Sequence, residues 1–199
     1  IMDSLMEYHT LDIQWGNHDI AWMGAGCGSE ACVATVVRTC IRYDTIHMLE
    51  NSYGISLRKL YLFAHETYGG DAPAAQDAGY KMPGSLGSSG SNATSPVERA
   101  IDIILFKLEG QLIMRRPGFG YEHRLLLDKI DREKGTICID GVEWPLATVD
   151  FPTVDPDRPY ELSEGERAVV DSLVRDFSHS ALLRKHVDFL YSHGSAYLV

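Results

Sequence analysis

The chain has 199 residues, 45% of them hydrophobic and 23% charged, and its formal net charge is −10. This composition excludes a disordered or fibrous chain and is enough for one hydrophobic core. The acidic balance argues against binding of nucleic acid, which needs a positive surface. No apolar run approaches the length of a membrane span.

The N-terminal third combines one short strand with several helices. Leu11, Ile13 and Trp15 alternate with polar neighbours, which predicts a strand over 9–15. Val33, Val36, Val37, Cys40 and Ile41 share one face of a helix over 30–43, which Ser29 would cap. The other expected elements are a helix-like segment over 1–8, a turn at Gly16-Asn17, a loose loop through Gly24, Gly26 and Gly28, and helices over 44–53 and 56–68.

A change of composition separates the two halves of the chain. Residues 71–95 are rich in Ala, Gly, Ser and Pro, which predicts a flexible linker. We therefore expect three parts: 1–70 with the strand, turn and helices, the linker 71–95, and a helical part with a β-hairpin over 96–199.

The second half contains long helices around one hairpin. Pro96 opens and Pro117-Gly118 ends an amphipathic helix over 96–116. Two short strands flank Asp140-Gly141, a pair typical of a type I′ turn. Ser163-Glu164-Gly165-Glu166 forms a capping box. The remaining expected elements are a short helical or extended piece over 122–129, an irregular stretch over 150–160, helices over 163–177 and 180–191, and a strand-like end over 195–199.

The cysteine spacing and the N-terminal sequence indicate in which cellular compartment the protein is expected. Cys27, Cys32, Cys40 and Cys138 show no CxxC spacing, so reduced thiols are expected rather than a zinc site or a disulfide scaffold. No secretory signal pattern is present, which favours the cytoplasm. Since residue 1 is Ile, we expect the chain to be an internal piece of a longer protein.

The strongest candidate for chemistry is Gly16-Asn17-His18-Asp19, directly after the predicted strand. Gly16 permits close backbone approach, and the amide oxygen of Asn17 is a hard ligand for Mn²⁺ or Mg²⁺. His18 can protonate a leaving alkoxide or stabilise a phosphoryl group, and Asp19 can orient the imidazole or cap the next segment. A polar turn without function is the alternative, because these residues favour turns anyway.

Two other groups of residues are weaker candidates. Arg115, Arg116 and His123 are candidates for contacting a sugar phosphate or an effector, since arginine forks suit such groups. Their alternative explanation is that basic residues stabilise the end of a helix. Trp15 and Trp22 are expected to pack around the turn, although Trp22 is near enough to leave stacking on a sugar open.

The Gly-Asn-His-Asp turn resembles the third sequence block of the calcineurin-like metallophosphoesterases. Three longer stretches closely resemble class III fructose-1,6-bisphosphatases: DIQWGNHDIAWMGAGCGSEACVATVVR, LEGQLIMRRPGFGYEHRLLLDKI and FPTVDPDRPYELSEGERAVVDSL. The resemblance implies an α/β fold that is part of a calcineurin-like metallophosphoesterase sandwich, mostly helical here and with a β-hairpin. It also implies a phosphatase that converts fructose 1,6-bisphosphate to fructose 6-phosphate and phosphate in gluconeogenesis, with the sugar bisphosphate as its small-molecule partner.

The same resemblance implies a site with two metal ions, Mn²⁺ or Mg²⁺, with Asn17 as a ligand, His18 as the acid and Asp19 beside it. The Asp-x-His, Gly-Asp-x-x-Asp-Arg and Gly-His blocks of the family are absent from the chain. Residues outside the chain would therefore complete the site, and the chain alone should be inactive. Homo-oligomerisation stays open. The alternatives are another metallophosphoesterase, acting on phosphoproteins or dinucleotides, and a non-catalytic helical interaction module.

Overall fold

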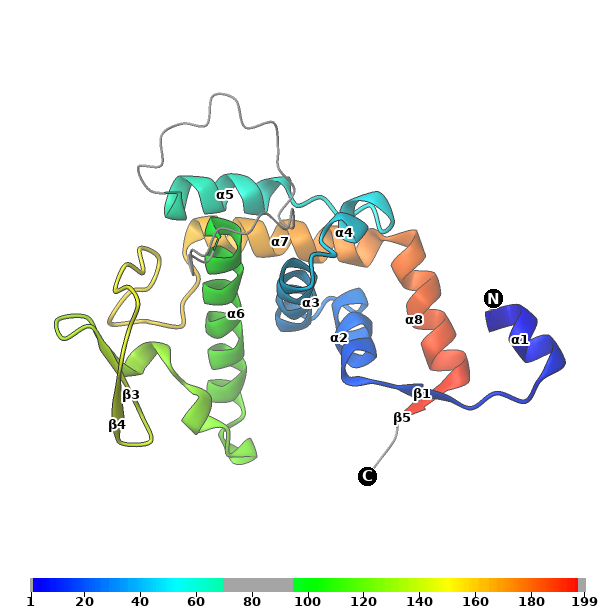
Figure 1. Cartoon of the computed structure of the whole chain (residues 1–199), viewed down its shortest axis with the longest axis horizontal. Helices are drawn as coiled ribbons and strands as arrows, with labels where there is room; N and C mark the ends of the chain where they lie inside the picture. Colours follow the sequence, from blue (N-terminus) through cyan, green and yellow to red (C-terminus); the bar gives the residue numbers. More distant parts are fainter. Residues whose placement is uncertain (1, 70–94, 197–199) are drawn as a thin grey trace, which may run out of the picture.

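The computed structural model describes residues 2–69 and 95–196, and most of these residues are helical. The helices are α1 (Met2–Tyr8), α2 (Asn17–Gly26), α3 (Glu30–Arg42), α4 (His47–Asn51), α5 (Arg58–Tyr68), α6 (Pro96–Arg115), α7 (Glu164–His179) and α8 (Ala181–His193) (Figure 1). Three 3-10 turns, η1 (Pro117–Phe119), η2 (Glu122–Arg124) and η3 (Leu127–Lys129), follow α6. The expected linker lies outside the described residues, except for Ser95.

Within residues 2–69 and 95–196, five short strands form two separate sheets. Strand β1 (Ile13–Trp15) pairs in parallel with β5 (Gly194–Ala196), so segments from opposite ends of the chain lie side by side. Strands β2 (Ile130–Asp131), β3 (Thr136–Ile139) and β4 (Val142–Pro145) form an antiparallel sheet in that order. Figure 1 shows this sheet beyond α6, away from β1 and β5. Strands and a helical majority confirm the α/β prediction at this coarse level.

The predicted hairpin is confirmed, and its turn has the expected backbone. Asp140 and Gly141 connect β3 to β4, and their φ angles are +51° and +78°. A type I′ turn requires a positive φ at both central residues. Aspartate and glycine tolerate that conformation better than most residues, which explains why this pair marks the hairpin.

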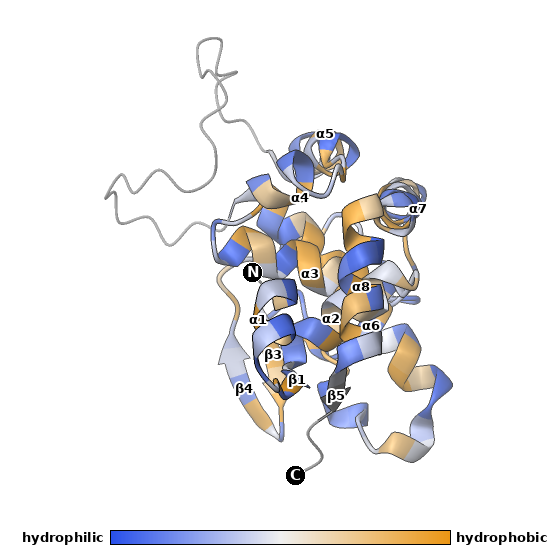
Figure 2. Cartoon of the chain, turned by 90° about the vertical axis from the view of Figure 1, so that its right-hand side faces the viewer, coloured by the Kyte–Doolittle hydropathy of each residue, from blue (hydrophilic) through white to orange (hydrophobic). Residues whose placement is uncertain are grey.

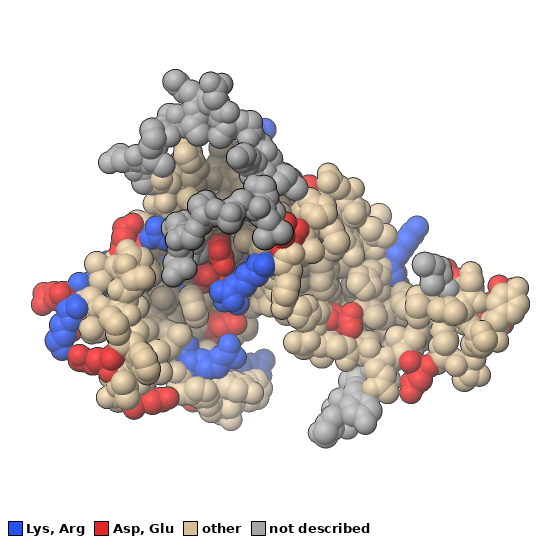
Figure 3. Space-filling view, viewed as in Figure 1, with Lys and Arg blue, Asp and Glu red and all other residues tan. Residues whose placement is uncertain are grey.

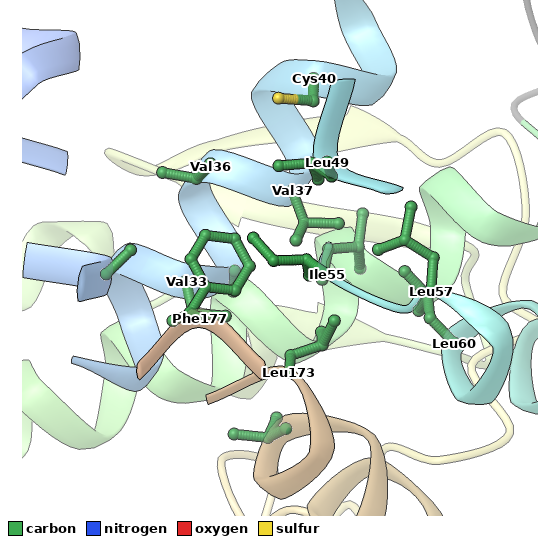
Figure 4. Packing of buried hydrophobic residues seen from close by; sticks show 14 of the residues in the cluster. Val33, Val36, Val37, Cys40, Leu49, Ile55, Leu57, Leu60, Leu173 and Phe177 are labelled. Carbon is green, nitrogen blue, oxygen red and sulfur yellow. The ribbon is translucent and has the colours of Figure 1, made fainter. Parts of the chain in front are cut away.

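Helix α3 supplies the centre of the main hydrophobic core. Val33, Val36, Val37 and Cys40 on its predicted face are buried. Figure 4 shows the three valines around Phe177 of α7, with Cys40 further along α3. Burying a side chain the size of Phe177 contributes about 1.5–3 kcal/mol. Further buried side chains of this cluster come from α5, α6 and α8. Figure 2 shows apolar stretches on these helices beside polar ones, as in amphipathic helices.

The core takes side chains from both sides of the undescribed stretch, and the division into three parts stays a prediction. Within the described residues, no helix is long and apolar enough to cross a membrane. Helix α1 buries none of its residues.

The predicted capping residues begin the helices that form the core. Ser163 Oγ accepts a hydrogen bond from the Glu166 N–H (3.3 Å), and Glu166 Oε2 accepts one from the Ser163 N–H (2.7 Å). This confirms the capping box of α7. Ser29 Oγ accepts from the Cys32 N–H at 3.4 Å and caps α3 as expected. These bonds satisfy N–H groups that a helix start otherwise leaves unpaired.

A smaller cluster joins α6 to the region around the antiparallel sheet. Its buried members are Ile103, Leu127, Val154 and Tyr160. The Tyr160 hydroxyl donates a hydrogen bond to Asp128 Oδ1 at 2.6 Å. Burial and the Asp128 carboxylate raise the pKa of Tyr160, so the phenol stays neutral and keeps its proton for this bond.

The expectation of a loose loop through Gly24 and Gly26 is wrong, as is the turn at Asn17, because α2 begins at Asn17 and continues to Gly26. Close packing explains these glycines. A Cβ at Gly24 would lie 2.5 Å from Cys32 Sγ on α3, and one at Gly26 would lie 2.9 Å from Val187 Cγ2 on α8. The glycines therefore let three helices approach each other closely, which outweighs their low helix propensity.

Gly24→Ala is expected to destabilise the protein despite the better helix propensity of alanine. The propensity gain is about 0.5–1 kcal/mol, whereas overpacking costs about 1–3 kcal/mol. Thermal melting of the full-length protein should show a lower melting temperature for Gly24→Ala. Adding Cys32→Ala should restore most of the loss, with Cys32→Ala alone as the control. A higher melting temperature for Gly24→Ala would contradict close packing of α2 on α3.

Candidate functional site

Strand β1 is held in place by contacts with α8. Ile13 and Trp15 are half-buried and Gln14 is exposed, as the sequence predicts. The strand is shorter than the predicted 9–15, because Leu11 is exposed and lies before it. Trp15 Nε1 donates a hydrogen bond to the Leu190 carbonyl at 3.0 Å. A Cβ at Gly194 would lie 2.1 Å from Trp15 Nε1, so this glycine makes room for the indole. These contacts fix the point from which the candidate residues project.

Gly16 links β1 to α2 without an intervening loop. It has an extended backbone (φ −84°, ψ 174°), and its N–H donates a hydrogen bond to Asp19 Oδ2 at 2.8 Å. Asp19 therefore caps the start of α2, which is one of its two predicted roles. An acidic side chain in the first turn also interacts favourably with the helix dipole. No described hydrogen bond joins Asp19 to the His18 imidazole.

Asn17 and His18 occupy the first turn of α2, and both are exposed. Asn17 Oδ1 accepts a hydrogen bond from the His18 N–H at 3.0 Å, which leaves a second lone pair on this oxygen. The His18 ring lies 6.3 Å from the Tyr43 ring, at an interplanar angle of 54°. The structure thus places an amide oxygen and an imidazole on consecutive exposed residues just after a strand, as the sequence predicts.

A pocket of 190 Å³ lies between the first turn of α2 and the middle of α3. Its lining residues are Asn17, His18, Ala21, Trp22, Thr35, Val36 and Thr39. The Trp22 ring lies 4.8 Å from that of Tyr53. Burial raises the pKa of the Tyr53 phenol, so the partner of Trp22 remains uncharged. Trp22 thus packs against Tyr53 and also forms a wall of the pocket.

The donor atoms suit part of a metal site. Asn17 offers a neutral amide oxygen, which can act as a ligand of a hard divalent cation. Over residues 2–69 and 95–196, no group of three His, Cys, Asp or Glu side chains is arranged to hold a metal ion. The described residues therefore fit one ligand of such an ion and do not fit a complete coordination sphere.

Arg115 lines a different pocket from Asn17 and His18. This pocket measures 360 Å³ and lies where α6 meets the start of α3 and α7. Arg115 Nε donates to the Gln111 carbonyl within its own helix, at 3.1 Å. Arg167, on the same pocket, is paired with Glu30 at 2.7 Å. The two pockets flank α3 and share no lining residue.

The other two weak candidates lie beyond the end of α6. Arg116 caps α6, and exposed His123 belongs to η2, where its carbonyl accepts from Lys129 Nζ at 3.0 Å. Neither residue lines the pocket beside His18. The roles assigned to Arg115, Arg116 and His123 stay predictions.

Charge over the visible face in Figure 3 is mixed. Acidic and basic side chains alternate over the antiparallel sheet at the left, whereas the region of α2 and α8 shows few charges. Lys134, for example, pairs with Asp131 at 3.5 Å and with Glu143 at 3.3 Å.

All four cysteines are free.

Sequence reasoning missed the α3 wall of the pocket. Thr35 and Thr39 stand four residues apart, with Tyr43 four further on. This spacing places all three on one helix face. The spacing was visible in the sequence, but only the packing of α2 on α3 shows that this face lies beside His18.

Comparison with known proteins identifies the family. A family model described as Firmicute fructose-1,6-bisphosphatase matches residues 1–199. Because the match spans the whole chain, the chain belongs to this family of phosphatases.

Named relatives agree with the family match. The chain is 48% identical over 200 residues to a protein of Listeria monocytogenes serotype 4b (strain CLIP80459), and 47% identical over 198 residues to one of Clostridium botulinum (strain Alaska E43 / Type E3). A Clostridium novyi (strain NT) protein is 46% identical over 199 residues. All three are named fructose-1,6-bisphosphatase class 3, and each alignment covers 100% of this chain but 30% of the relative. No solved structure matches the chain.

Proposed function

We propose that the full-length protein hydrolyses the 1-phosphate of fructose 1,6-bisphosphate, and that this chain supplies the β1–α2 corner of its active site. The observation that carries the proposal is the pair Asn17 and His18, held at the end of β1 within a chain that matches the family over its whole length. The chain spans less than a third of the length of the relatives it matches, so the proposal concerns the longer enzyme.

His18 would act as the general acid. Water attacks phosphorus, the bond between phosphorus and the C1 oxygen breaks, and the imidazole gives its proton to that oxygen. The products are fructose 6-phosphate and inorganic phosphate. Asp19 would act indirectly, because its hydrogen bond to the Gly16 N–H fixes the turn that carries His18.

Asn17 would be the metal ligand contributed by this chain, with the remaining ligands coming from other parts of the enzyme. Mn²⁺ or Mg²⁺ bound there would polarise the phosphoryl oxygens as a Lewis acid. A calcineurin-like sandwich would place β1 and β5 in a larger sheet, which suits a parallel pair too short to be stable alone.

Hydrolysis by the full-length protein tests the proposal, measured as released phosphate for the sugar bisphosphate and the phosphopeptide and as released nucleotide for the dinucleoside polyphosphate. Fructose 1,6-bisphosphate, a phosphopeptide and a dinucleoside polyphosphate would be compared with Mn²⁺, with Mg²⁺ and with a chelator. We expect the sugar bisphosphate to be preferred and the chelator to abolish turnover. A preference for the phosphopeptide or the dinucleotide would favour another metallophosphoesterase. No turnover with any ester would favour the interaction module.

Asn17→Ala should raise the Mn²⁺ concentration needed for half-maximal activity. Loss of a ligand is expected to exceed the roughly 10-fold minimum seen when supporting residues around a metal are lost. The matched control is Asn51→Ala, at an exposed asparagine of α4. An unchanged Mn²⁺ requirement for Asn17→Ala would remove Asn17 from the metal site.

A further inference from the structure

The pocket beside His18 has two chemically different walls. Asn17 and His18 form the wall on α2, where the proposed reaction takes place. Thr35 and Thr39 form the opposite wall on α3, and both are half-buried. A ligand in this pocket therefore contacts the reacting corner and a hydroxyl-bearing helix face at the same time.

The threonine hydroxyls are available for hydrogen bonds in different ways. Thr35 Oγ1 donates to the Ala31 carbonyl at 2.8 Å, so its oxygen can still accept hydrogen bonds. The Thr39 hydroxyl forms no hydrogen bond with any described residue, and it can both donate and accept. A partner that carries hydroxyl groups of its own would satisfy both side chains.

The rest of the lining suits an uncharged ring. None of the described residues in its wall is Lys, Arg, Asp or Glu, and Ala21, Trp22 and Val36 provide apolar surface. Its 190 Å³ is smaller than the roughly 300–1,000 Å³ of sites for drug-sized ligands. These properties fit one small polyhydroxylated ring better than a phosphate group, which would need positive partners.

We propose that this pocket is the subsite for the sugar ring of the substrate, and that the Thr39 hydroxyl binds a sugar hydroxyl there. The inference rests on the proposed function, because His18 can protonate the sugar oxygen only if the sugar lies next to it. Thr39 is then a specificity-determining residue on α3.

The test uses the full-length enzyme and separates the sugar from the phosphate. Thr39→Val removes the hydroxyl at nearly constant volume, and Thr39→Ser retains it. Thr67→Val, at a half-buried threonine of α5, is the matched control. The readouts are kcat and KM for fructose 1,6-bisphosphate and the inhibition constants of the two products, fructose 6-phosphate and inorganic phosphate.

Thr39→Val should raise both KM and the inhibition constant of fructose 6-phosphate by about 2- to 10-fold, the effect of one lost neutral hydrogen bond. The inhibition constant of inorganic phosphate and kcat should change less than about 2-fold, as expected for loss of uniform binding. Thr39→Ser and Thr67→Val should resemble the unaltered enzyme. If Thr39→Val proves unstable in thermal melting, Thr39→Ala provides the same comparison.

Two outcomes would overturn the subsite. One is an unchanged inhibition constant for fructose 6-phosphate in a folded Thr39 variant without the hydroxyl. The other is an equal rise in the inhibition constants of both products, which would indicate general damage to the site. Failure of the proposed function looks different, because the unaltered enzyme would then release no phosphate from fructose 1,6-bisphosphate.

Discussion

His18→Ala in the full-length enzyme is expected to lower kcat for fructose 1,6-bisphosphate by about 10²- to 10⁴-fold, the usual contribution of a general acid. This loss corresponds to about 3–5 kcal/mol of transition-state stabilisation. KM should change little, because the imidazole acts on the leaving oxygen and the sugar contacts on α3 remain. His18 is exposed at the start of α2, so its removal should leave folding intact.

Steady-state kinetics with matched variants would measure this effect. His18→Asn keeps a polar side chain that has no titratable proton, and it should lose as much kcat as His18→Ala. His47→Ala, at an exposed histidine of α4, is the control and should behave as the unaltered enzyme. An undiminished kcat for His18→Ala would show that another group protonates the sugar oxygen.

Lys107→Met should have the largest effect on stability. Lys107 Nζ lies 2.7 Å from Glu166 Oε2, and both side chains are fully buried. Lys107 also donates to the Thr153 carbonyl, so one ammonium group ties α6 to α7 and to the loop before α7. Its removal leaves a buried carboxylate without its cation, which typically costs about 3–5 kcal/mol. Thermal melting of the full-length enzyme would show the loss.

A second substitution tests whether charge is the cause. Replacing both partners, with Lys107→Met and Glu166→Leu together, should recover most of the stability, because no buried charge then remains. The lost capping bond to Ser163 should leave a deficit of about 1 kcal/mol. Lys185→Met, at an exposed lysine of α8, should have almost no effect. A double variant as unstable as Lys107→Met would point to packing rather than charge.

The helices and the hairpin could be predicted because the residues that determine them lie close together in the sequence. The apolar stripe of α3, the capping box at Ser163 and the Asp140-Gly141 turn each depend on neighbours in the chain. Glycine misled the prediction at α2, because Gly24 and Gly26 are explained by distant Cys32 and Val187. A glycine in the sequence is compatible both with a flexible loop and with a close contact between helices. Only the packing of the helices shows which of the two applies.

Features that join distant segments could not be predicted. Glu166 was visible as a capping residue, but its partner Lys107 lies 59 residues away in another helix. The corner with Asn17 and His18 was predicted by a local strand and a short motif, whereas the wall with Thr35 and Thr39 depends on how α3 packs. The α2 side of the candidate site could therefore be predicted from the sequence, whereas the α3 side depends on tertiary packing.

The parallel pairing of β1 with β5 has a consequence for how this chain can be altered. Parallel neighbours need a crossover of a dozen or more residues, and here everything from Gly16 to His193 serves as that single crossover. The helical body thus leaves one strand and returns on the adjacent one, like an insertion with closely spaced attachment points. A change of length far from these two ends is therefore expected to leave the register of Ile13 against Gly194 the same.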